Sequence, residues 1–515
     1  MKKLSDYSDF SAFKSMDPVS QIGLEKESLR VDNKGISKKP HPISLGSSLF
    51  NKFITTDFSE SQLEIVTPPF QDKEKMINFL DDIHHFISAK IDDELIWPFS
   101  IPMAIDSNCK IPIAEYGTSN LAKLKHIYRK GLANRYSREM QIISGLHFNF
   151  SLSKPTIEAI FLNHDLDAYE YEKSDTYLRA LRNNFRYNWL ILYLFGASPI
   201  LSKDLVSSTD SFKKLGNRYY YLEHATSLRM SKYGYKNSER ESLKVSLNSL
   251  EEYIRDLREA AKTESKQFKH FEDSNRMFEN QLNSNILQIE DEYYAIARVK
   301  STSTALKPLS AKLEKNGIDF IELRSLDLDP FSPVGVKLET IYFLEVYMWY
   351  CFLTKSDPIA NDEHEEIDQN EYLVALYGRR PDLKLTKQGK KIQLSTWSNE
   401  IFDDLYLIAE NLDKQDTHYV DAINNFKSMI KDPDQTISAR IIRDSAGRKN
   451  GFEELGFTIS ENYKDAYKSI KIQKNPTNTL FESEVENSII KQRDLENSDE
   501  PPFEEFLNNY LKNLN

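Results

Sequence analysis

One segment, residues 144–152, decides the class of fold, and it reads Ser144-Gly145-Leu146-His147-Phe148-Asn149-Phe150-Ser151-Leu152. Successive side chains of a β-strand point to opposite faces of the sheet, so residues two apart share a face. Leucine and phenylalanine therefore cover one face of this strand, while His147, Asn149 and Ser151 occupy the other. An apolar face toward a core and a polar face toward water or a cavity are typical of antiparallel sheets.

Three further segments gather polar groups by the same alternation: Glu25 with Glu27, Gln62 with Glu64 just after Asp57, and Glu322 with Arg324. Solvated faces of ordinary strands would give the same pattern, and for any single strand this interpretation is the more common one. If all four polar faces line one concave surface, they offer hard oxygen ligands beside a guanidinium. That set suits Mg²⁺ bridging nucleotide phosphates, because Mg²⁺ prefers oxygen ligands and shares them with phosphate.

The order of elements predicts an α+β fold built on an antiparallel sheet and elaborated by many helices. Residues 21–155 mix strand and helical patterns, and residues 281–335 show strand patterns again, whereas helical patterns dominate residues 156–280 and 336–470. Strands separated by helical blocks, without regular β–α–β alternation, favour this class over α/β. We expect one catalytic unit over residues 1–470 and a polar, peripheral segment over residues 471–515.

Composition excludes several functional classes. The 79 acidic residues outnumber the 67 basic ones, giving a net charge of −12, whereas a general nucleic-acid binder needs a basic surface. The chain has only 16 glycines, and neither the dinucleotide-binding fingerprint nor the P-loop occurs. No signal peptide or membrane-spanning stretch is found. The two cysteines, Cys109 and Cys351, lie far apart, so we expect free thiols in a cytoplasmic protein.

Three short motifs invite a metal or nucleic-acid interpretation that their surroundings disfavour. His364-Glu365-Glu366-Ile367-Asp368 differs from a zinc-binding H-E-x-x-H because Asp368 replaces the second histidine, so we expect a solvated acidic loop. The pair His84-His85 has no third ligand at a useful spacing. The basic stretch 384–391 is balanced by acidic neighbours and lacks a nucleic-acid motif.

A long series of motifs, taken in order, carries a family resemblance. It comprises Gly23-Leu24-Glu25-Lys26-Glu27-Ser28-Leu29-Arg30-Val31, Ile54-Thr55-Thr56-Asp57-Phe58 with Gln62-Leu63-Glu64, Tyr128-Arg129-Lys130-Gly131-Leu132, residues 144–150, Ala225-Thr226-Ser227-Leu228-Arg229, residues 283–290, Ile321-Glu322-Leu323-Arg324-Ser325-Leu326-Asp327 and residues 330–335. The series resembles the glutamate–cysteine ligases (γ-glutamylcysteine synthetases) of the γ-proteobacterial type. The resemblance covers about residues 20–335 and continues more loosely to about 470. From the length we expect a single-function enzyme without the ATP-grasp domain of a fused bifunctional glutathione synthetase.

The resemblance implies an activity and a fold. Members of this family use ATP to join the γ-carboxylate of L-glutamate to the amine of L-cysteine through γ-glutamyl phosphate, the first step of glutathione biosynthesis. The implied fold is glutamine synthetase-like, with antiparallel strands forming an active-site funnel. Two or three Mg²⁺ ions, with Mn²⁺ as a substitute, are the implied cofactors. The resemblance also favours a monomer, with small molecules and neither nucleic acid nor membrane as partners.

The matching motifs also imply roles for individual residues. The implied metal ligands are Glu25, Glu27, Asp57, Glu64, His147 and Glu322. Two alternatives stay open. Glu27 supports a metal ligand without contacting the metal itself, and His147 hydrogen-bonds substrate or phosphate instead of binding metal. The implied catalytic arginines are Arg324, Arg129 and Arg229, and Arg298 is the implied ATP contact. The implied cysteine pocket comprises Phe58, Tyr128, Leu132, Gln141, Tyr235 and Tyr294.

Two other functions compete with this interpretation. One is a related carboxylate–amine ligase with a different amine acceptor. The other is a catalytically silent paralogue that binds only glutamate or nucleotide. The complete set of carboxylates argues against the silent paralogue, since binding alone does not require every one of them.

Overall fold

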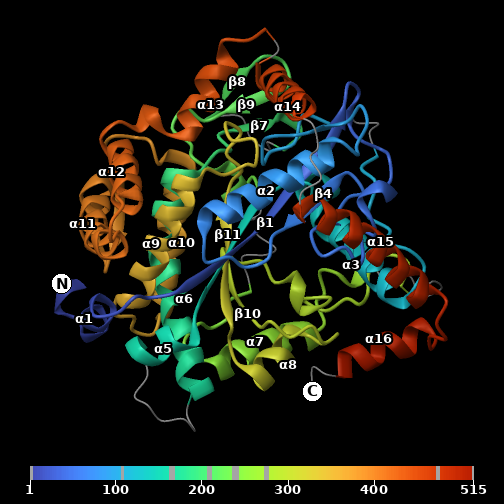
Figure 1. The fold of residues 1–515 in the computed structure, drawn as a ribbon, viewed down its shortest axis with the longest axis horizontal. Coiled ribbons are helices and arrows are strands. Elements are labelled where there is room, and N and C mark those ends of the chain that lie inside the picture. Colours follow the sequence, from blue (N-terminus) through green and yellow to red (C-terminus); the bar gives the residue numbers. More distant parts are fainter. Residues whose placement is uncertain are drawn as a thin grey trace.

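The computed structural model describes residues 4–105, 110–161, 169–205, 211–234, 243–271, 278–449, 451–470 and 476–512. Within these ranges the largest sheet has eight strands, in the order β10-β11-β6-β1-β4-β3, with β2 and β5 also pairing with β1 (Figure 1). The strands are β1 (Ser20–Asp32), β2 (Gly35–Ile36), β3 (Ile54–Thr56), β4 (Gln62–Val66), β5 (Leu95–Ile96), β6 (Leu146–Leu152), β10 (Ala297–Lys300) and β11 (Phe320–Leu326). All of their pairings are antiparallel. The predicted α+β class with an antiparallel sheet is confirmed.

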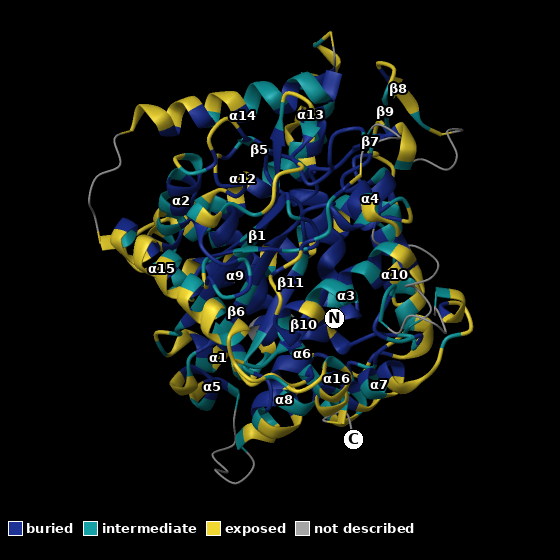
Figure 2. Cartoon of the chain, turned by 90° about the vertical axis from the view of Figure 1, so that its right-hand side faces the viewer, coloured by how far each residue is buried: buried dark blue, intermediate teal, exposed yellow. Residues whose placement is uncertain are grey.

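The apolar face of the sheet is anchored on long helices. Phe148 and Phe150 of β6 are fully buried, and they belong to one core with α2 (Lys73–Ser88), α6 (Tyr169–Phe195) and α9 (Leu338–Leu353). The ring of Phe150 meets Trp349 of α9 edge to face, with centroids 6.2 Å apart, a favoured geometry for aromatic pairs. Figure 2 shows β1 and α9 as buried. Because this face is buried in the core, the opposite face of the sheet is the one available for a site.

Strand register brings the polar residues together. Glu25 of β1 pairs directly with His147 of β6, and Glu27 pairs with Glu64 of β4. Directly paired residues of neighbouring strands lie on the same face of a sheet. Lys26, between the two glutamates, is buried on the opposite face, and that burial lowers its pKa to about 7.

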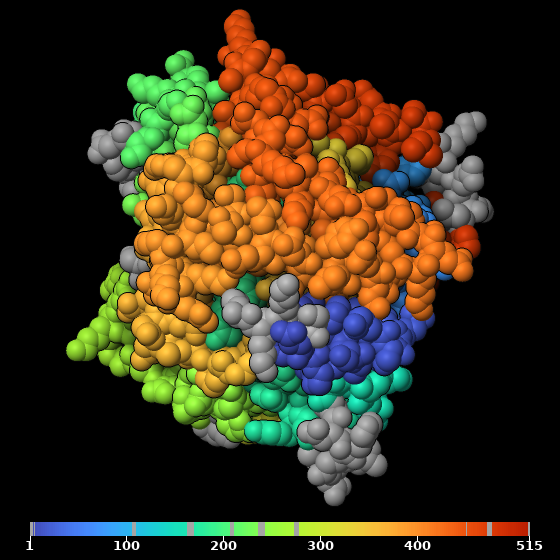
Figure 3. Space-filling model, turned by 90° about the vertical axis from the view of Figure 1, so that its left-hand side faces the viewer, coloured from blue at the N-terminus to red at the C-terminus, as the bar shows by residue number. Residues whose placement is uncertain are grey.

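Helices surround the sheet on the remaining sides. They include α1 (Ser8–Lys14), α5 (Lys154–Phe161), α7 (Leu250–Lys262), α8 (Leu309–Asn316), α10 (Asn361–Tyr377), α11 (Leu394–Leu412), α12 (His418–Lys431), α13 (Ile437–Ala446) and α14 (Gly451–Ser469). The orange region that contains α11 and α12 spreads across one side of the molecule, above the blue amino-terminal segment (Figure 3). No helix of the described residues is long and apolar enough to cross a membrane.

The regions expected to be helical also contain two small sheets. One consists of β7 (Ile200–Ser202), β8 (Lys213–Leu215) and β9 (Tyr219–Tyr221), and the other of β12 (Lys384–Lys387) and β13 (Lys390–Gln393). Gly216 and Gly389 lie in the two hairpin turns with positive φ angles of 63° and 75°, a conformation that glycine adopts without strain. These strands are only three or four residues long, which is too short for a period-2 pattern to be evident in the sequence.

The segment expected to be an acidic loop is helical instead. Residues 361–368 form the first two turns of α10. Asp362 and Glu363 lie in the first turn, where the positive end of the helix dipole favours acidic side chains. The acidic run therefore starts a helix.

The carboxyl-terminal segment packs more closely than the expected polar periphery. It forms α15 (Pro476–Glu496), which packs on α2, and α16 (Phe503–Leu511), which packs on α3 (Asn120–Tyr136). Phe481, Leu507 and Tyr510 are buried, although the outer faces of α14 and α15 are exposed (Figure 2). The helix periodicity of these few apolar residues attaches an otherwise polar segment to the body of the protein.

Candidate active site

Carboxylates and a histidine converge on the polar face of the sheet. Ligand atoms of Glu25, His147 and Glu322 all lie within 4.8 Å of one another. His147 Nδ1 is 3.3 Å from Glu25 Oε2 and 3.5 Å from Glu322 Oε1, and His147 Nε2 is 3.6 Å from Glu27 Oε1. The adjacent strands β1, β6 and β11 supply these four residues. The polar residues of these three strands therefore lie on one face of the sheet.

Neighbouring groups hold these side chains in place. Asn149 Nδ2 donates a 2.8 Å hydrogen bond to Glu25 Oε1, and the main-chain N–H of Gly145 donates one of 2.8 Å to Glu27 Oε2. Thr55 donates one of 3.0 Å to Glu64. Asn149 Oδ1 is buried without a hydrogen-bond partner, so it is an additional oxygen available to a cation.

The charges of the site show that a cation fits it. Burial and then the charges of Asp57 and Glu64 raise the pKa of Glu27 well above its ordinary value. Burial, with Asp57 and Glu25, also raises the pKa of Glu64 to about 7. Carboxylates crowded in this way lack compensating positive charge. A divalent cation with oxygen ligands would supply it, and Mg²⁺ takes such ligands.

Glu322 and His147 differ from the crowded pair. Burial alone would raise the pKa of Glu322, but Lys300 and Arg324 outweigh it and hold that pKa far below its ordinary value. Burial and the neighbouring Arg324 lower the pKa of His147, which keeps the ring neutral, as a metal ligand requires. These shifts favour a carboxylate at Glu322 and a neutral ring at His147, which can offer a lone pair to a cation.

The three predicted arginines have different surroundings. Arg324 Nη1 lies 3.0 Å from Glu322 Oε1 on the polar face of β11. Arg129 of α3 donates a 2.6 Å hydrogen bond to the main-chain oxygen of Asp57 and lies 3.3 Å from its carboxylate. Arg229 also lines the cavity, but its Nε donates a 2.6 Å hydrogen bond to buried Asp327 and its Nη2 one of 2.7 Å to the carbonyl of Leu326. The guanidinium of Arg229 therefore holds the end of β11.

A cavity of about 500 Å³ joins the predicted residues. Its walls include all six predicted metal ligands, the three arginines, Arg298, and the predicted pocket residues Phe58, Tyr128, Leu132, Gln141 and Tyr294. Tyr235, also predicted for the cysteine pocket, lies outside the described residues. The volume is in the range of small-molecule sites.

Sequence reasoning missed several residues that line this cavity, among them Lys125, Lys300, Lys307, Lys312 and Tyr510. Two of them carried a usable signal. Lys125 is one helical turn before Arg129, and Lys300 is two residues after Arg298 on the same strand, so each shares a face with a predicted residue. Tyr510 carried none, because its approach to the site depends on how α16 packs against α3.

Carboxylates, a histidine and several arginines and lysines gathered in one cavity of an antiparallel sheet are the groups expected in an enzyme site for anionic substrates and metal ions. The family model for glutamate–cysteine ligase matches residues 3–374. The glutamate–cysteine ligase of Aliivibrio salmonicida is 37% identical over 96% of this chain and 95% of its own length. That of Wigglesworthia glossinidia brevipalpis is 39% identical over 93% and 95%. The chain belongs to the glutamate–cysteine ligase family of enzymes.

Solved structures agree with this assignment. The glutamate–cysteine ligase of Francisella tularensis, determined in complex with AMP, has a TM-score of 0.88 and 34% identity, covering 96% of this chain and 98% of that one. A bifunctional glutathione synthetase from Pasteurella multocida has a TM-score of 0.69 and 25% identity, covering 89% of this chain and 53% of that one. The fold and the family assignment therefore agree.

Proposed function

We propose that this protein joins the γ-carboxylate of L-glutamate to the amine of L-cysteine at the expense of ATP, with γ-glutamyl phosphate as the intermediate. The reaction is the first step of glutathione biosynthesis. The observation that carries the proposal is the convergence of Glu25, His147 and Glu322 beside Arg324 in a chain of this family.

The order of bond changes follows from the chemistry of the substrates. A carboxylate is a poor acylating agent, so a γ-carboxylate oxygen first attacks the terminal phosphorus of ATP and ADP leaves. The cysteine amine then attacks the acyl carbon, the amide bond forms, phosphate leaves, and the amine loses a proton. The first step brings two anions together, so positioning and charge neutralisation are the main tasks of the site.

Residues of this chain would perform those tasks. Glu25, Glu27, Asp57, Glu64, His147 and Glu322 would hold two or three Mg²⁺ ions, or Mn²⁺ in substitution. When bound, such ions neutralise phosphate charge and align the reacting oxygens. Arg324 and Arg129 would contact the transferred phosphoryl group, because a guanidinium binds oxyanions with two parallel hydrogen bonds. Arg229 would position the end of β11 and so the guanidinium of Arg324.

The nucleotide has candidate partners on β10 and α8. Arg298 pairs directly with Glu322 in the sheet, and its Nε is buried without a hydrogen-bond partner. Lys300 of β10 and Lys312 of α8 also line the cavity. The Francisella tularensis relative was determined in complex with AMP, which supports nucleotide binding by a protein of this family.

The amine acceptor has a separate, less polar region. Phe58 and Leu132 are buried in one apolar cluster, with Tyr128 packed against it, and all three line the cavity. A small, mostly apolar surface with aromatic edges suits a thiol-bearing side chain. We therefore propose this region, with Gln141 and Tyr294, as the cysteine pocket.

An isotope experiment tests the intermediate. Glutamate labelled with ¹⁸O in its γ-carboxylate should transfer one ¹⁸O atom to each phosphate released, because that oxygen bridges carbon and phosphorus in γ-glutamyl phosphate. Mass spectrometry of the phosphate gives the answer. Unlabelled phosphate from a productive reaction would rule out the acyl phosphate.

An amine panel tests the acceptor and separates the rival functions. Phosphate release with glutamate, ATP and Mg²⁺ should be stimulated most by L-cysteine and by its isostere L-2-aminobutyrate. Stronger stimulation by another amine would favour a related ligase with a different acceptor. Binding of glutamate and nucleotide without turnover for any amine would favour the silent paralogue.

A further inference from the structure

Lys125 of α3 lines the active-site cavity together with Arg129, which follows it by one helical turn. Among the described residues, Lys125 Nζ forms neither an ion pair nor a hydrogen bond. Burial and the neighbouring Arg129 lower the pKa of Lys125 to about 8, although the charges of Glu64, Asp291 and Asp57 act in the opposite direction. At neutral pH the amine therefore keeps its proton, and no described group accepts a hydrogen bond from it.

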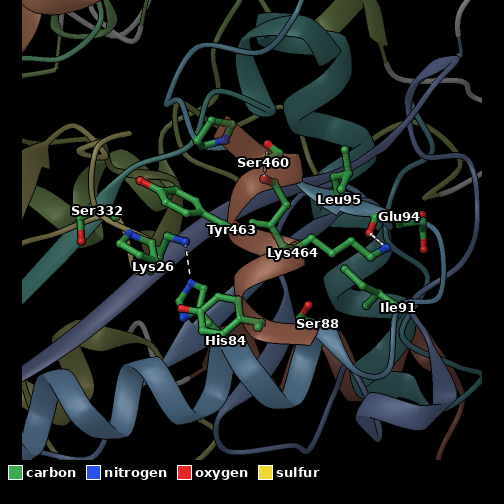
Figure 4. A pocket seen from close by; sticks show the side chains of 15 residues that line it. Lys26, His84, Ser88, Ile91, Glu94, Leu95, Ser332, Ser460, Tyr463 and Lys464 are labelled. Atoms are coloured by element: carbon green, nitrogen blue, oxygen red, sulfur yellow. Dashed lines mark hydrogen bonds between the residues drawn. The ribbon is translucent and has the colours of Figure 1, made fainter. Parts of the chain in front are cut away.

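Lys26, on the reverse face of β1, shows by contrast how a buried amine is satisfied. It lies in a small cavity of about 40 Å³, and its Nζ lies 2.7 Å from His84 Nε2 (Figure 4). His84 Nδ1 lies 2.7 Å from the carbonyl oxygen of Leu80, and a carbonyl only accepts, so Nδ1 carries the ring hydrogen and Nε2 accepts from Lys26. A neutral amine fits that cavity without any ligand, whereas Lys125 has no such acceptor within the described ranges.

Tyr116 places its ring against both cations of α3. The centroid of the ring lies 4.7 Å from Arg129 Cζ and 5.2 Å from Lys125 Nζ, within the range of a cation–π interaction. The hydroxyl group lies 2.6 Å from the carbonyl oxygen of Thr56 and 2.5 Å from that of Asp57, which fixes the ring. Tyr116 is 3% exposed and has a φ of 62°. This conformation is strained for a tyrosine, and such strain is found where surrounding contacts impose it, often at functional sites.

The hydrogen bonds of Arg129 fix its guanidinium beside Lys125. Its Nε donates one of 2.6 Å to the carbonyl oxygen of Asp57, and its Nη1 donates one of 3.2 Å to the carbonyl oxygen of Lys125. Its Nη2 lies 3.3 Å from the Asp57 carboxylate. Each terminal nitrogen of a guanidinium carries two hydrogens, so each retains one for an oxyanion in the cavity.

We propose that Lys125 binds the terminal phosphate of ATP, beside Arg129 and with Tyr116 as the positioning residue of both cations. A compact ammonium and a planar guanidinium side by side give a phosphate two complementary kinds of contact. Arg129 is assigned above to the transferred phosphoryl group, and Lys125 lies one helical turn away in the same wall. The inference rests on the nucleotide binding proposed above and adds a residue that recognises the group to be transferred.

Equilibrium binding of three nucleotides tests the contact. With Mg²⁺ present, calorimetry should show that Lys125→Met weakens the affinity for the non-hydrolysable ATP analogue AMP-PNP about tenfold, the usual cost of a lost charged hydrogen bond. The affinities for ADP and AMP should stay unchanged. Lys125→Arg should keep most of the affinity for AMP-PNP. Lys123→Met, at an exposed position of the same helix, removes the same charge and should behave as the wild type does.

The outcomes separate this inference from the proposed function. Unchanged affinity of Lys125→Met for AMP-PNP would overturn the inference, as would an equal loss for all three nucleotides, which indicates a general distortion of the cavity. Loss of glutamate affinity in place of AMP-PNP affinity would assign Lys125 to a substrate carboxylate and would also overturn it. These results leave the proposed function standing. A wild type that binds no nucleotide would refute both.

Two substitutions of Tyr116 test the role of its ring. Tyr116→Phe keeps the ring against both cations and should retain the preference for AMP-PNP over AMP, measured as the ratio of the two affinities. Tyr116→Leu removes the ring and should lower this ratio about threefold, the magnitude of a cation–π interaction. The same ratio in both variants would overturn the role of Tyr116 as the positioning residue.

Discussion

At the scale of single residues, electrostatic environment separates groups of identical chemistry. Glu322 is held ionised by Lys300 and Arg324, whereas burial and other carboxylates raise the pKa of Glu64 to about 7. Both line the same cavity. Their positions relative to the cations of β10 and β11 account for the difference, and the two side chains should respond differently to substitution and to pH.

Glu322→Gln should abolish Mg²⁺-dependent turnover, with a loss of about 10²-fold or more. The amide keeps the size of the side chain but removes the charge that faces Lys300, Arg324 and the metal site. Steady-state phosphate release measures the effect, and circular dichroism reports whether the fold is retained. Glu115→Gln, at an exposed position, is the matched control and should retain full activity. Near-normal activity of Glu322→Gln would mean that our metal site is misplaced.

Mg²⁺ binding should release protons at pH 6.5, and the apparent affinity for Mg²⁺ should rise between about pH 6 and pH 8. The sign follows from Glu64: its pKa of about 7 leaves it largely protonated at pH 6.5, and a metal ligand must be deprotonated. Calorimetry in buffers of different ionisation enthalpy counts the protons. Glu64→Gln should release fewer. Equal release by wild type and variant would exclude Glu64 as the source.

At the scale of elements, the site depends on how strand ends and helices are held. Arg229 is on a short 3₁₀ turn (Leu228–Met230) and reaches the carbonyls at the end of β11. α16 brings Tyr510 to the cavity by packing its apolar face on α3. Both elements act on the geometry of the cavity from outside the main sheet.

Arg229→Ala should destabilise the protein by about 3–5 kcal/mol, because it leaves Asp327 buried without its ion partner. The side chain of Asp327 is fully buried, and its carboxylate also accepts hydrogen bonds from the main-chain N–H of Ala197 and from Ser198. Urea unfolding measures the loss. Arg229→Lys keeps the charge and should lose less. Equal stability of Arg229→Ala and wild type would show that the ion pair does not hold this end of β11.

Deletion of the chain from residue 500 onward should lower kcat/KM by about tenfold or more. The truncation removes Tyr510, which is buried beside Leu124 and Tyr128 in one apolar cluster, and opens one wall of the cavity to water. Tyr510→Ala should reproduce most of the loss, since truncation of a positioning contact commonly costs this much. Steady-state kinetics with each substrate varied measures it. Asn508→Ala, exposed on the same helix, is the control, and an equal loss in that variant would point to a general effect on α16.

At the scale of the whole molecule, one chain supplies the entire described cavity. Its walls come from β1, β4, β6, β10, β11, α3, α8 and α16, which span the chain from residue 20 to residue 511. We propose that residues 1–470 form one catalytic unit, with the carboxyl-terminal helices attached to it. We propose that this unit works without a second subunit.

The protein should therefore behave as a monomer of about 60 kDa, matching the chain mass of 59.9 kDa. Size-exclusion chromatography with light scattering gives the mass directly, with and without ATP and Mg²⁺. A stable dimer whose dissociation removes activity would contradict this expectation. A dimer whose activity does not change on dilution would contradict only the predicted monomeric state. The assignment of the cavity to one chain would stand.

Much of the site was predictable because its residues follow strand periodicity. His147 and Asn149, Glu25 and Glu27, and Glu322 and Arg324 share faces through the two-residue repeat of a strand, and the structure places them on one surface. Tyr510 and the bonding of Arg229 were not predictable, because each depends on packing between segments far apart in the chain. The hairpins at Gly216 and Gly389 were missed because their strands are too short to show alternation.

The sequence by itself determined which side chains share a face and which chemistry they offer. That information is local, because the alternation of side chains is a property of an extended backbone. The tertiary structure alone decided that β11, β6, β1 and β4 are neighbours, in a register that sets Glu25 against His147 and Glu27 against Glu64. It also decided that Lys26 lies buried on the reverse face, hydrogen-bonded to His84. Strand order and burial depend on the free energy of packing the whole chain, which no short stretch of residues contains.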